Sequence, residues 1–278
     1  MAGIEGKVAD HYTSGGLTSR VEAALAALGV EPENAAPDDL KPVDEFHTGG
    51  VQATDDLLDQ LAITKETRVL DIGCGLGGAA RHVAHRSGAH VTGVDLTPEF
   101  IETARDQCGQ VGLADLTEFA VGSALDLPVE TGAFDLALMF HVGMNVEDKA
   151  GLMFEARRAL AKGGVFAIFD VMRAEDEATP LDFPVPWSEV AETSFVTPLA
   201  TYAEAAASAG FELVASRART QFALDFFAAA FAKAAKDGPS PLGIHLMMKA
   251  TAGEKIQNYL TNVKSGRITP TELILRAT

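Results

Sequence analysis

Apolar and polar positions follow two different periods along the middle of the chain. Short apolar runs predict strands, and between them apolar residues recur every three or four positions, which predicts helices. The strands are expected at 68–72, 90–96, 118–121, 134–140 and 165–171, and the helices at 78–87, 98–111 and 147–161. Alternation of this kind favours a Rossmann-like α/β fold, a mostly parallel sheet with helices on both faces.

The segments before and after this alternating region predict additional helices, a lid and further strands. Helical spacing recurs at 17–29 and 51–61, whereas the Pro- and Asp-rich stretch 31–42 predicts a connector. Residues 172–197 contain three prolines and the only Trp, and we interpret them as an inserted lid. The expected order ends with a helix at 199–209, a strand at 211–216, helices within 222–263 and a seventh strand at 271–275.

We therefore expect two parts. Residues 1–50 would form an N-terminal helical cover that is mobile and becomes ordered when a ligand binds, with Gly pairs as pivots. Residues 51–278 would form the main domain, with insertions at about 172–197 and 222–263.

Composition narrows the choice of partner. The 278 residues include 39 acidic and 22 basic side chains, so the net charge is −17, which opposes binding to nucleic acid. The two Cys residues make neither a disulfide framework nor a zinc cluster. The sequence shows no secretory signal, and its most apolar late stretch is too short and too charged for a membrane span. We expect a cytoplasmic protein that acts on a small molecule, with no membrane partner, and leave a homo-oligomer open.

The sharpest chemical signal is the Gly-rich turn Asp71-Ile-Gly-Cys-Gly-Leu-Gly-Gly78 between a predicted strand and helix. Gly73 and Gly75 let the backbone turn tightly and approach a ligand. Asp95 ends the next strand, where a carboxylate can accept hydrogen bonds from both hydroxyls of a ribose. The pattern predicts a nucleoside-containing ligand.

The same glycines also satisfy the dinucleotide-binding pattern, which by itself is weak. Asp71 decides against it, because a carboxylate there would repel a pyrophosphate but suits a ligand with an ammonium group. An NAD(P)-dependent oxidoreductase is therefore the disfavoured alternative.

These residues resemble the motifs of class I S-adenosylmethionine-dependent methyltransferases of the type 11-like group. The resemblance covers about residues 45–175 and is carried by segments 69–78, 91–96, 134–140 and 157–165. Asp44-Glu-Phe-His-Thr-Gly-Gly50, together with residues 77–81, is similar to the sarcosine/dimethylglycine N-methyltransferase-like branch.

The resemblance implies S-adenosyl-L-methionine as cofactor and gives residues roles toward it. Asp71, Gly73 and Gly75 would face its methionine part, Asp95 its ribose, and Leu96 its adenine. Ser123 and Ala124 would edge the adenine amino group, although Ser123 stands where many relatives carry Asp.

Residues outside the Gly-rich turn are candidates for closing the site. His47 and Tyr12 would close over the cleft from the cover and contact the cofactor or substrate, or else have a plain packing role. His82 and His85 are spaced like a metal pair, but no third ligand is evident, so we expect no metal. Four Phe residues between 222 and 231 have helical spacing and favour core or dimer surface.

The acceptor side is expected at the loop after the fourth strand, because ligands of open α/β sheets bind outside the carboxyl ends of strands. His141, Met144 and Asn145 lie there. His141 is our candidate catalytic base and a cofactor contact, or else a structural histidine. Asn145 is a substrate ligand or the N-cap of the next helix. Trp187 would contact substrate from the lid or anchor that loop.

The sequence thus predicts an enzyme that transfers a methyl group from S-adenosylmethionine to a small acceptor, first an amine of the sarcosine/dimethylglycine type. Two alternatives stay open. One is O-methylation of a small phenol or lipid-like acceptor, and the other is a non-catalytic protein that binds S-adenosylmethionine.

Overall fold

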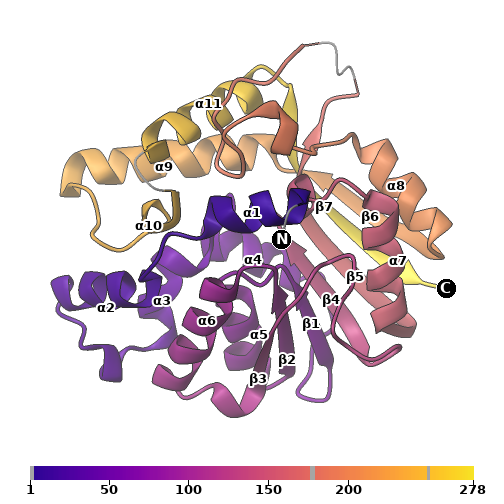
Figure 1. The fold of residues 1–278 in the computed structure, drawn as a ribbon, viewed down its shortest axis with the longest axis horizontal. Coiled ribbons are helices and arrows are strands. Elements are labelled where there is room, and N and C mark those ends of the chain that lie inside the picture. The colour runs from indigo at the N-terminus through magenta and orange to yellow at the C-terminus, as the bar shows by residue number, and fades with distance from the viewer. Residues whose placement is uncertain (1–2, 176–178, 249–250) are drawn as a thin grey trace.

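The computed structural model describes residues 3–175, 179–248 and 251–278, and its centre is one sheet (Figure 1). Within these residues seven strands pair in the order β3-β2-β1-β4-β5-β7-β6. β7 is antiparallel to both of its neighbours, and β1 to β5 pair in parallel. The mostly parallel seven-stranded sheet expected from the sequence is confirmed. The strands are β1 (Arg68–Ile72), β2 (His90–Asp95), β3 (Thr117–Val121), β4 (Phe134–Phe140), β5 (Leu160–Arg173), β6 (Phe211–Ala218) and β7 (Ile268–Ala277).

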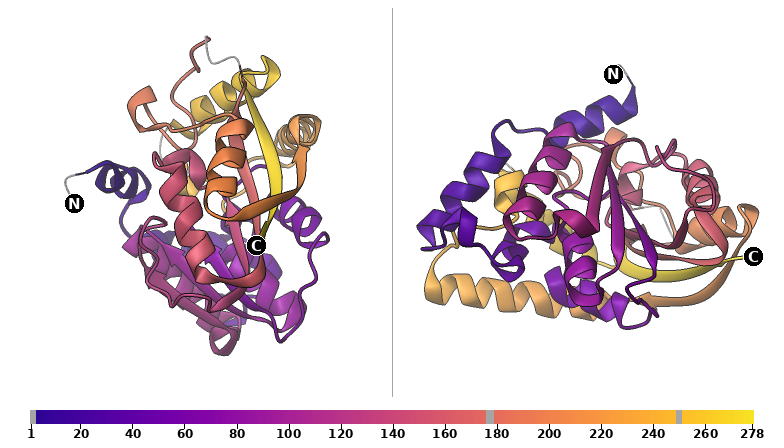
Figure 2. Two further views of the ribbon diagram at one scale, coloured as in Figure 1. Left: turned by 90° about the vertical axis from the view of Figure 1, so that its right-hand side faces the viewer. Right: turned by 90° about the horizontal axis from the view of Figure 1, so that it is seen from below.

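Helices cover both faces of the sheet, as its central strands require (Figure 2). In β5, Phe166 and Ile168 pack into one buried cluster, while Ala167 and Phe169 pack into the other, because successive strand residues point to opposite faces. The first cluster includes residues of α7 (Lys149–Ala159) and α8 (Leu199–Ser208). The second includes residues of α4 (Gly50–Leu58), α5 (Gly78–Ser87) and α6 (Pro98–Gln110).

The N-terminal cover is more helical than the sequence pattern indicates. It consists of α1 (Ile4–Tyr12), α2 (Leu17–Ala27), a 3₁₀ turn at Pro32–Asn34 and α3 (Pro37–Asp44). The expected connector at 31–42 is therefore wrong in its second half. Pro37 occupies the first turn of α3, which suits a residue without an N–H, and Leu40 and Val43 are fully buried on one side.

The C-terminal segments lie beyond the carboxyl ends of the strands, above the sheet in Figure 1. They are α9 (Thr220–Asp237), α10 (His245–Met248) and α11 (Ala252–Lys264). The described part of 172–197 contains the end of β5 and a 3₁₀ turn at Ala191–Thr193, and is otherwise irregular, as an insertion should be. Among the described residues, no helix is long and apolar enough to cross a membrane.

Candidate active site

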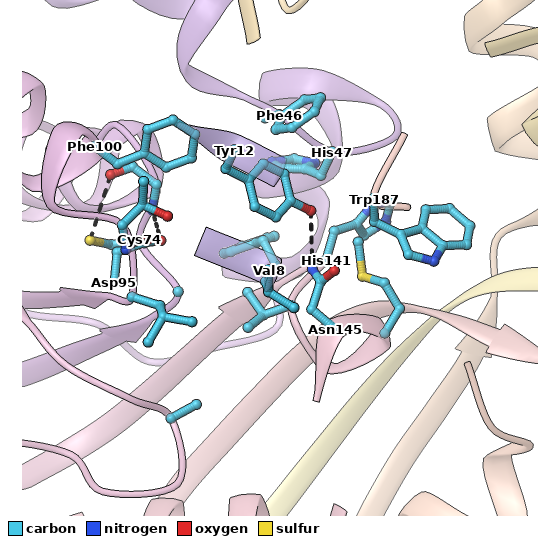
Figure 3. A pocket seen from close by; sticks show the side chains of 18 of the residues that line it. Val8, Tyr12, Phe46, His47, Cys74, Asp95, Phe100, His141, Asn145 and Trp187 are labelled. Carbon is cyan, nitrogen blue, oxygen red and sulfur yellow. Dashed lines mark hydrogen bonds between the residues drawn. The ribbon is translucent and has the colours of Figure 1, made fainter. Parts of the chain in front are cut away.

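A cavity of about 380 Å³ lies at the carboxyl ends of β1, β2 and β4. Its floor is the Gly-rich turn after β1, the end of β2 and the loop after β4. Its roof is formed by α1, by residues 44–48 and by Trp187 of the lid (Figure 3). Side chains of α9 and α11 complete the roof. The cavity brings together the predicted site residues Tyr12, His47, Asp71, Gly73, Gly75, Asp95, Leu96, Ala124, His141, Met144, Asn145 and Trp187.

The Gly-rich turn is shaped by backbone conformations that favour glycine. Gly73 and Gly75 have φ values of +73° and +53°. A Cβ on Gly73 would lie 2.2 Å from Cγ2 of Val142, whereas a Cβ on Gly75 would meet no atom within 4 Å. Gly73 is therefore required by packing, and Gly75 presents bare backbone to open space in which a ligand can lie.

Asp71 is a buried carboxylate with one unpaired oxygen that lines the cavity. It is the penultimate residue of β1, 1% of its surface is exposed, and its Oδ2 atom has no hydrogen-bond partner. Burial, together with the charges of Glu45 and Asp95, raises the pKa of Asp71 to about 7, against a hydrogen bond from the Ala80 backbone. An ammonium group in the cavity would supply both the missing donor and the compensating charge.

Asp95 is held in a fixed orientation at the end of β2. Its Oδ2 atom accepts a hydrogen bond from the Gly75 N–H at 2.9 Å, and Oδ1 accepts one from the Thr97 N–H at 2.8 Å. Burial nevertheless raises the pKa of Asp95 above its usual range. The carboxylate lines the cavity, where a ribose diol could donate hydrogen bonds to it.

Ser123 departs from the arrangement expected for the adenine end. Its neighbours Gly122 and Ala124 line the cavity, but Ser123 is not among the described lining residues. The Ser123 hydroxyl is paired with Glu5 of α1 and accepts a hydrogen bond from the Leu125 N–H. The side chain therefore ties α1 to this loop, and its contact with adenine stays a prediction.

His141 has a strained backbone and a buried, unpaired ring nitrogen. Its φ is +53°, in the left-handed region, and its N–H donates to the Phe169 carbonyl at 2.7 Å. Its Nε2 atom has no partner. Burial, and secondly the charge of His47, hold the pKa of His141 well below its usual range. The imidazole is therefore neutral at neutral pH.

The loop that carries His141 is positioned by a buried network on β5. Asp170 accepts hydrogen bonds from the Tyr202 hydroxyl at 2.7 Å and from the Gly143 backbone. A Cβ on Gly143 would lie 2.2 Å from Oη of Tyr202, so glycine is needed for this close approach. Burial raises the pKa of Asp170 to about 6, against these hydrogen bonds and the charge of Lys149.

His47 lies in the roof, between α3 and α4. Its Nε2 atom is 2.8 Å from Oε2 of Glu45, and its ring stacks on Phe140 with centroids 5.0 Å apart. The ring centroid is 5.9 Å from that of His141. Two predicted site residues that are 94 positions apart in the chain, His47 and His141, thus face one another across the cavity wall.

Tyr12 and Asn145 join the cover to the acceptor-side loop. The Asn145 Nδ2 group donates to the Tyr12 hydroxyl at 3.1 Å, while Oδ1 of Asn145 is buried without a partner (Figure 3). The alternative that Asn145 caps the following helix is wrong. Asp148 caps it, because its Oδ1 atom accepts a hydrogen bond from the Gly151 N–H at 2.8 Å.

Trp187 both lines the cavity and anchors the lid. Only 3% of its surface is exposed, its Nε1–H donates to the Ser194 hydroxyl at 2.9 Å, and its ring meets Tyr259 edge to face. Met144 is also buried and lines the cavity.

Several lining residues were not predicted from the sequence. The Phe46 and Phe100 rings lie about 6 Å from the Tyr12 ring, at 6.1 and 5.9 Å between centroids, and form an aromatic wall around it. The sequence marks these two residues only by position: Phe46 lies inside the segment 44–50, and Phe100 follows soon after Asp95. Phe227, which we assigned to core or dimer surface, is buried and lines the cavity.

His82, one of the two histidines spaced like metal ligands, pairs with a carboxylate of α4. His82 Nε2 is 2.7 Å from Oδ1 of Asp55, which also accepts from Arg86. In the described part of the chain no three His, Cys, Asp or Glu side chains gather as a metal site.

Comparison with known families agrees with this geometry. Residues 70–168 match the family model described as a methyltransferase domain. This stretch contains the Gly-rich turn, Asp95 and the loop after β4. The chain thus carries a methyltransferase domain on the fold of class I S-adenosylmethionine-dependent methyltransferases, which confirms the class predicted from the sequence.

Three similar curated proteins are methyltransferases, and two of them are named for different acceptors. Methyltransferase GfsG from Streptomyces halstedii is 31% identical over 134 residues, 48% of each chain. Ajmaline N-methyltransferase from Rauvolfia serpentina is 36% identical over 104 residues, 37% of this chain and 36% of that one. Tocopherol O-methyltransferase from Arabidopsis thaliana is 39% identical over 100 residues, 36% of this chain and 29% of that one. The matches thus span about half or less of these relatives.

Similar solved structures show the same fold. A protein from Galdieria sulphuraria, provisionally assigned as a sarcosine dimethylglycine methyltransferase, is 21% identical with a TM-score of 0.66, covering 82% of this chain and 86% of that one. Geranyl diphosphate C-methyltransferase from Streptomyces coelicolor A3(2) is 16% identical, with a TM-score of 0.67 and coverage of 82% and 79%. The cyclase SpnF is 22% identical, with a TM-score of 0.65 and coverage of 81% and 80%. Since one of these proteins is named as a cyclase, the fold alone does not specify the reaction.

Proposed function

We propose that this protein transfers a methyl group from S-adenosyl-L-methionine to a small-molecule acceptor. The observation that carries the proposal is the unpaired Oδ2 atom of buried Asp71 beside the open face of Gly75 and the fixed carboxylate of Asp95. In this assignment Asp71 binds the ammonium group of the cofactor and Asp95 binds its ribose. Leu96 and Ala124 contact the adenine, with Ser123 at the edge of that loop.

The bound cofactor supplies an electrophilic methyl group on a sulfonium, and the protein's own part is to place the acceptor. An in-line displacement needs the acceptor atom about 3–3.5 Å from the methyl carbon and water excluded. The loop after β4 supports this, because Asp170 and Tyr202 fix its backbone from below. The roof of α1, Tyr12 and Trp187 excludes water from above.

His141 is placed to orient the acceptor. Its neutral imidazole has an unpaired Nε2 atom, which can accept or donate one hydrogen bond according to its tautomer. Asn145, through its unpaired Oδ1 atom, can accept a hydrogen bond from an amine or a hydroxyl. Met144 and Trp187 supply apolar contact. His141 remains our candidate for taking up the proton that an amine or phenol loses.

The electrostatics of the cavity favour an acceptor without a carboxylate. Its described lining contains no Arg or Lys but seven acidic side chains: Glu5, Asp44, Glu45, Asp71, Asp95, Glu147 and Asp148. A glycine-derived amine such as sarcosine would find no such cation for its carboxylate. The apolar side chains of the roof would contact the rest of the acceptor: Ile4, Val8, Phe227, Ile244 and Ile256.

We therefore propose an acceptor that is mostly apolar and carries one amine or hydroxyl. An amine follows the resemblance found in the sequence, and a phenol or lipid-like alcohol follows the lining. Both are small molecules, in keeping with a roofed cavity.

Calorimetry followed by turnover tests this function. We expect binding of S-adenosylmethionine and S-adenosylhomocysteine and no binding of NAD. Acceptors are then compared by formation of S-adenosylhomocysteine: sarcosine and dimethylglycine against apolar amines and small phenols. Binding of NAD in place of the two sulfur nucleosides refutes the proposal. Tight binding without turnover of any acceptor favours the non-catalytic alternative, and turnover confined to sarcosine and dimethylglycine refutes the apolar acceptor.

A further inference from the structure

Lys149 is a buried lysine that has no role in the function proposed above. It is the first residue of α7, it follows the loop after β4 directly, and 4% of its surface is exposed. The N-terminal end of a helix carries a partial positive charge, and burial of an ammonium group is costly. Neither the helix nor the core therefore favours a lysine here, and its position has to be explained by what its side chain holds.

The ammonium group of Lys149 joins the loop after β4 to the lid. Its Nζ atom donates hydrogen bonds to the carbonyl of Val146 and, at 2.7 Å, to the carbonyl of Phe195, which is 46 positions away in the chain. The Phe195 N–H in turn donates to the carbonyl of Met144 at 2.8 Å. Both polar backbone groups of Phe195 thus hold the lid against the loop, and we call this set of contacts the Lys149 clasp.

The surroundings of Lys149 keep its ammonium group charged. The Nζ atom lies 5.6 Å from the centroid of the Tyr202 ring, and the Tyr202 hydroxyl donates to Asp170. Burial lowers the pKa of Lys149 to about 8, against the charges of Asp170 and Glu147, so most of the side chain is protonated at pH 7. The clasp is therefore built on the same network that fixes the backbone of Gly143.

The clasp is connected to the cavity through the lid. Ser194, the residue before Phe195, accepts a hydrogen bond from Nε1 of Trp187 at 2.9 Å. Trp187 and Met144 both line the cavity, whereas Lys149 is not among the described lining residues. Lys149 can therefore act on a bound molecule only through the residues that it holds.

The first part of the lid has separate attachments on α11. Asn262 exchanges two hydrogen bonds with the backbone of Asp182, both at 3.0 Å, and Asn258 donates to the Pro184 carbonyl at 3.0 Å. These contacts hold the lid before Trp187, and the clasp holds it after Trp187. Loss of the clasp should therefore loosen the end of the lid without releasing the whole insertion.

We propose that Lys149 is a positioning residue that fixes the lid and the loop after β4 relative to one another. In this way it keeps Trp187 and Met144 directed at the same bound acceptor. The cofactor half of the cavity, built on β1 and β2, does not depend on the clasp. This inference rests on the proposed function only in assigning the half next to the lid to the acceptor.

Trp187 is the only Trp in the chain, so its fluorescence reports on the lid without an acceptor. Lys149→Met keeps a long unbranched side chain but removes the donors to both carbonyls. We expect quenching of Trp187 by acrylamide to become about two- to fivefold more efficient, because the end of the lid opens locally. Binding of S-adenosylhomocysteine by calorimetry should stay within about threefold, which also shows that the variant is folded.

Two further variants provide the matched comparisons. Lys149→Arg keeps charged donors and should restore most of the protection of Trp187, which an effect of packing alone would not do. Lys162 is exposed on β5, and Lys162→Met should leave the quenching unchanged.

Turnover supplies a second measurement of the same role. With an acceptor that the unaltered protein methylates, Lys149→Met should raise the KM for that acceptor about tenfold, because its contacts are no longer preset. The KM for S-adenosylmethionine should not change. Lys149→Arg should recover most of the affinity for the acceptor.

The outcomes separate this inference from the function on which it rests. Unchanged quenching in Lys149→Met overturns the clasp, whatever the protein binds. Increased quenching with an unchanged KM for the acceptor, or with a matching loss of S-adenosylhomocysteine affinity, overturns a role confined to the acceptor half. Failure of the unaltered protein to bind S-adenosylhomocysteine overturns the proposed function, and the quenching comparison then still decides whether Lys149 holds the lid.

Discussion

The local motif predicts that Asp71 lies at the ligand site, and the side chain does line the cavity, but the motif does not predict the pKa of its carboxyl. Its place before the first glycine predicted a ligand with an ammonium group. The sequence did not indicate that Glu45 and Asp95 would surround it and that burial would raise its pKa to about 7. These effects come from residues 26 and 24 positions away, so they depend on the folded arrangement.

The raised pKa of Asp71 predicts a pH-dependent cost to stability. The folded protein retains a proton on Asp71 that the unfolded chain releases near pH 4, so this group's contribution to the free energy of unfolding falls as pH rises from about 4 to 7. The slope approaches roughly 1.4 kcal/mol per pH unit. In Asp71→Asn the contribution is absent. Urea unfolding of both proteins from pH 4 to 8 should show their difference changing in this window.

Binding of S-adenosylhomocysteine provides the control for this prediction. Saturating S-adenosylhomocysteine supplies an ammonium to Asp71 and should stabilise the unaltered protein more at pH 7.5 than at pH 5, but Asp71→Asn should lack that pH-dependent gain. Parallel pH profiles for the two unliganded proteins would contradict the assigned pKa shift.

Substitution of Asp95 is expected to weaken binding of the cofactor. Its two oxygens are preset by the N–H groups of Gly75 and Thr97, so little ordering is needed when a diol binds. Asp95→Ala removes charge-assisted hydrogen bonds of roughly 1.5–3 kcal/mol each. We expect at least tenfold weaker binding of S-adenosylhomocysteine by calorimetry, with Asp95→Asn in between. Equal affinity of the Ala variant would remove the ribose assignment.

Among the elements, the strands were the most predictable from sequence and the cover was the least. Near-continuous apolar runs such as β4 can be satisfied only by burial on both faces, so their pattern leaves little choice. α3 was missed because Pro37 and Pro42, with three Asp residues, resemble a connector. α1 was missed because only Gly6 and Ala9 are buried, which leaves almost no apolar stripe to detect.

α3 contributes to stability through Leu40, which the sequence pattern assigned to a connector and not to a buried helix face. Leu40 has no exposed surface, and it belongs to the cluster that joins the cover to Phe100 of α6. Leu40→Ala should lower the free energy of unfolding by about 2–5 kcal/mol. Leu28, in the same cover but 49% exposed, is the matched control and should change it by less than about 0.5 kcal/mol on substitution by Ala. Similar costs for the two would show that α3 is not packed as described.

The site as assembled in the fold depends on contacts between distant segments. Tyr12 meets Asn145, Ser123 meets Glu5, and Trp187 meets Tyr259, and none of these pairs is marked by a local motif. A single sequence therefore predicts the cofactor floor, where the turn itself carries the chemistry. It also predicts that a cover and a lid close over the cleft, but it does not predict the contacts within that roof, because these depend on which helices come together.

The roof leads to a prediction about closure. α1 buries little of itself, but it lines the cavity and is fastened by Tyr12, whereas α2 and α3 are held by buried Leu and Val side chains. We therefore expect opening to be confined to α1 and the cofactor to favour the closed form. Lys7, exposed on α1, should be cleaved by trypsin several-fold more slowly when S-adenosylhomocysteine is present.

Lys236 supplies the internal control for this experiment, because it is exposed near the end of α9, an element separate from α1. Its cleavage rate should not depend on the ligand, so the ratio of the two rates, followed by mass spectrometry, isolates α1 from any general stabilisation. Tyr12→Phe removes the hydroxyl that accepts the Asn145 hydrogen bond and should raise cleavage at Lys7 with no change at Lys236. If ligand slows both sites equally, the cover is not a separate lid, and the protein is stabilised by its cofactor as one unit.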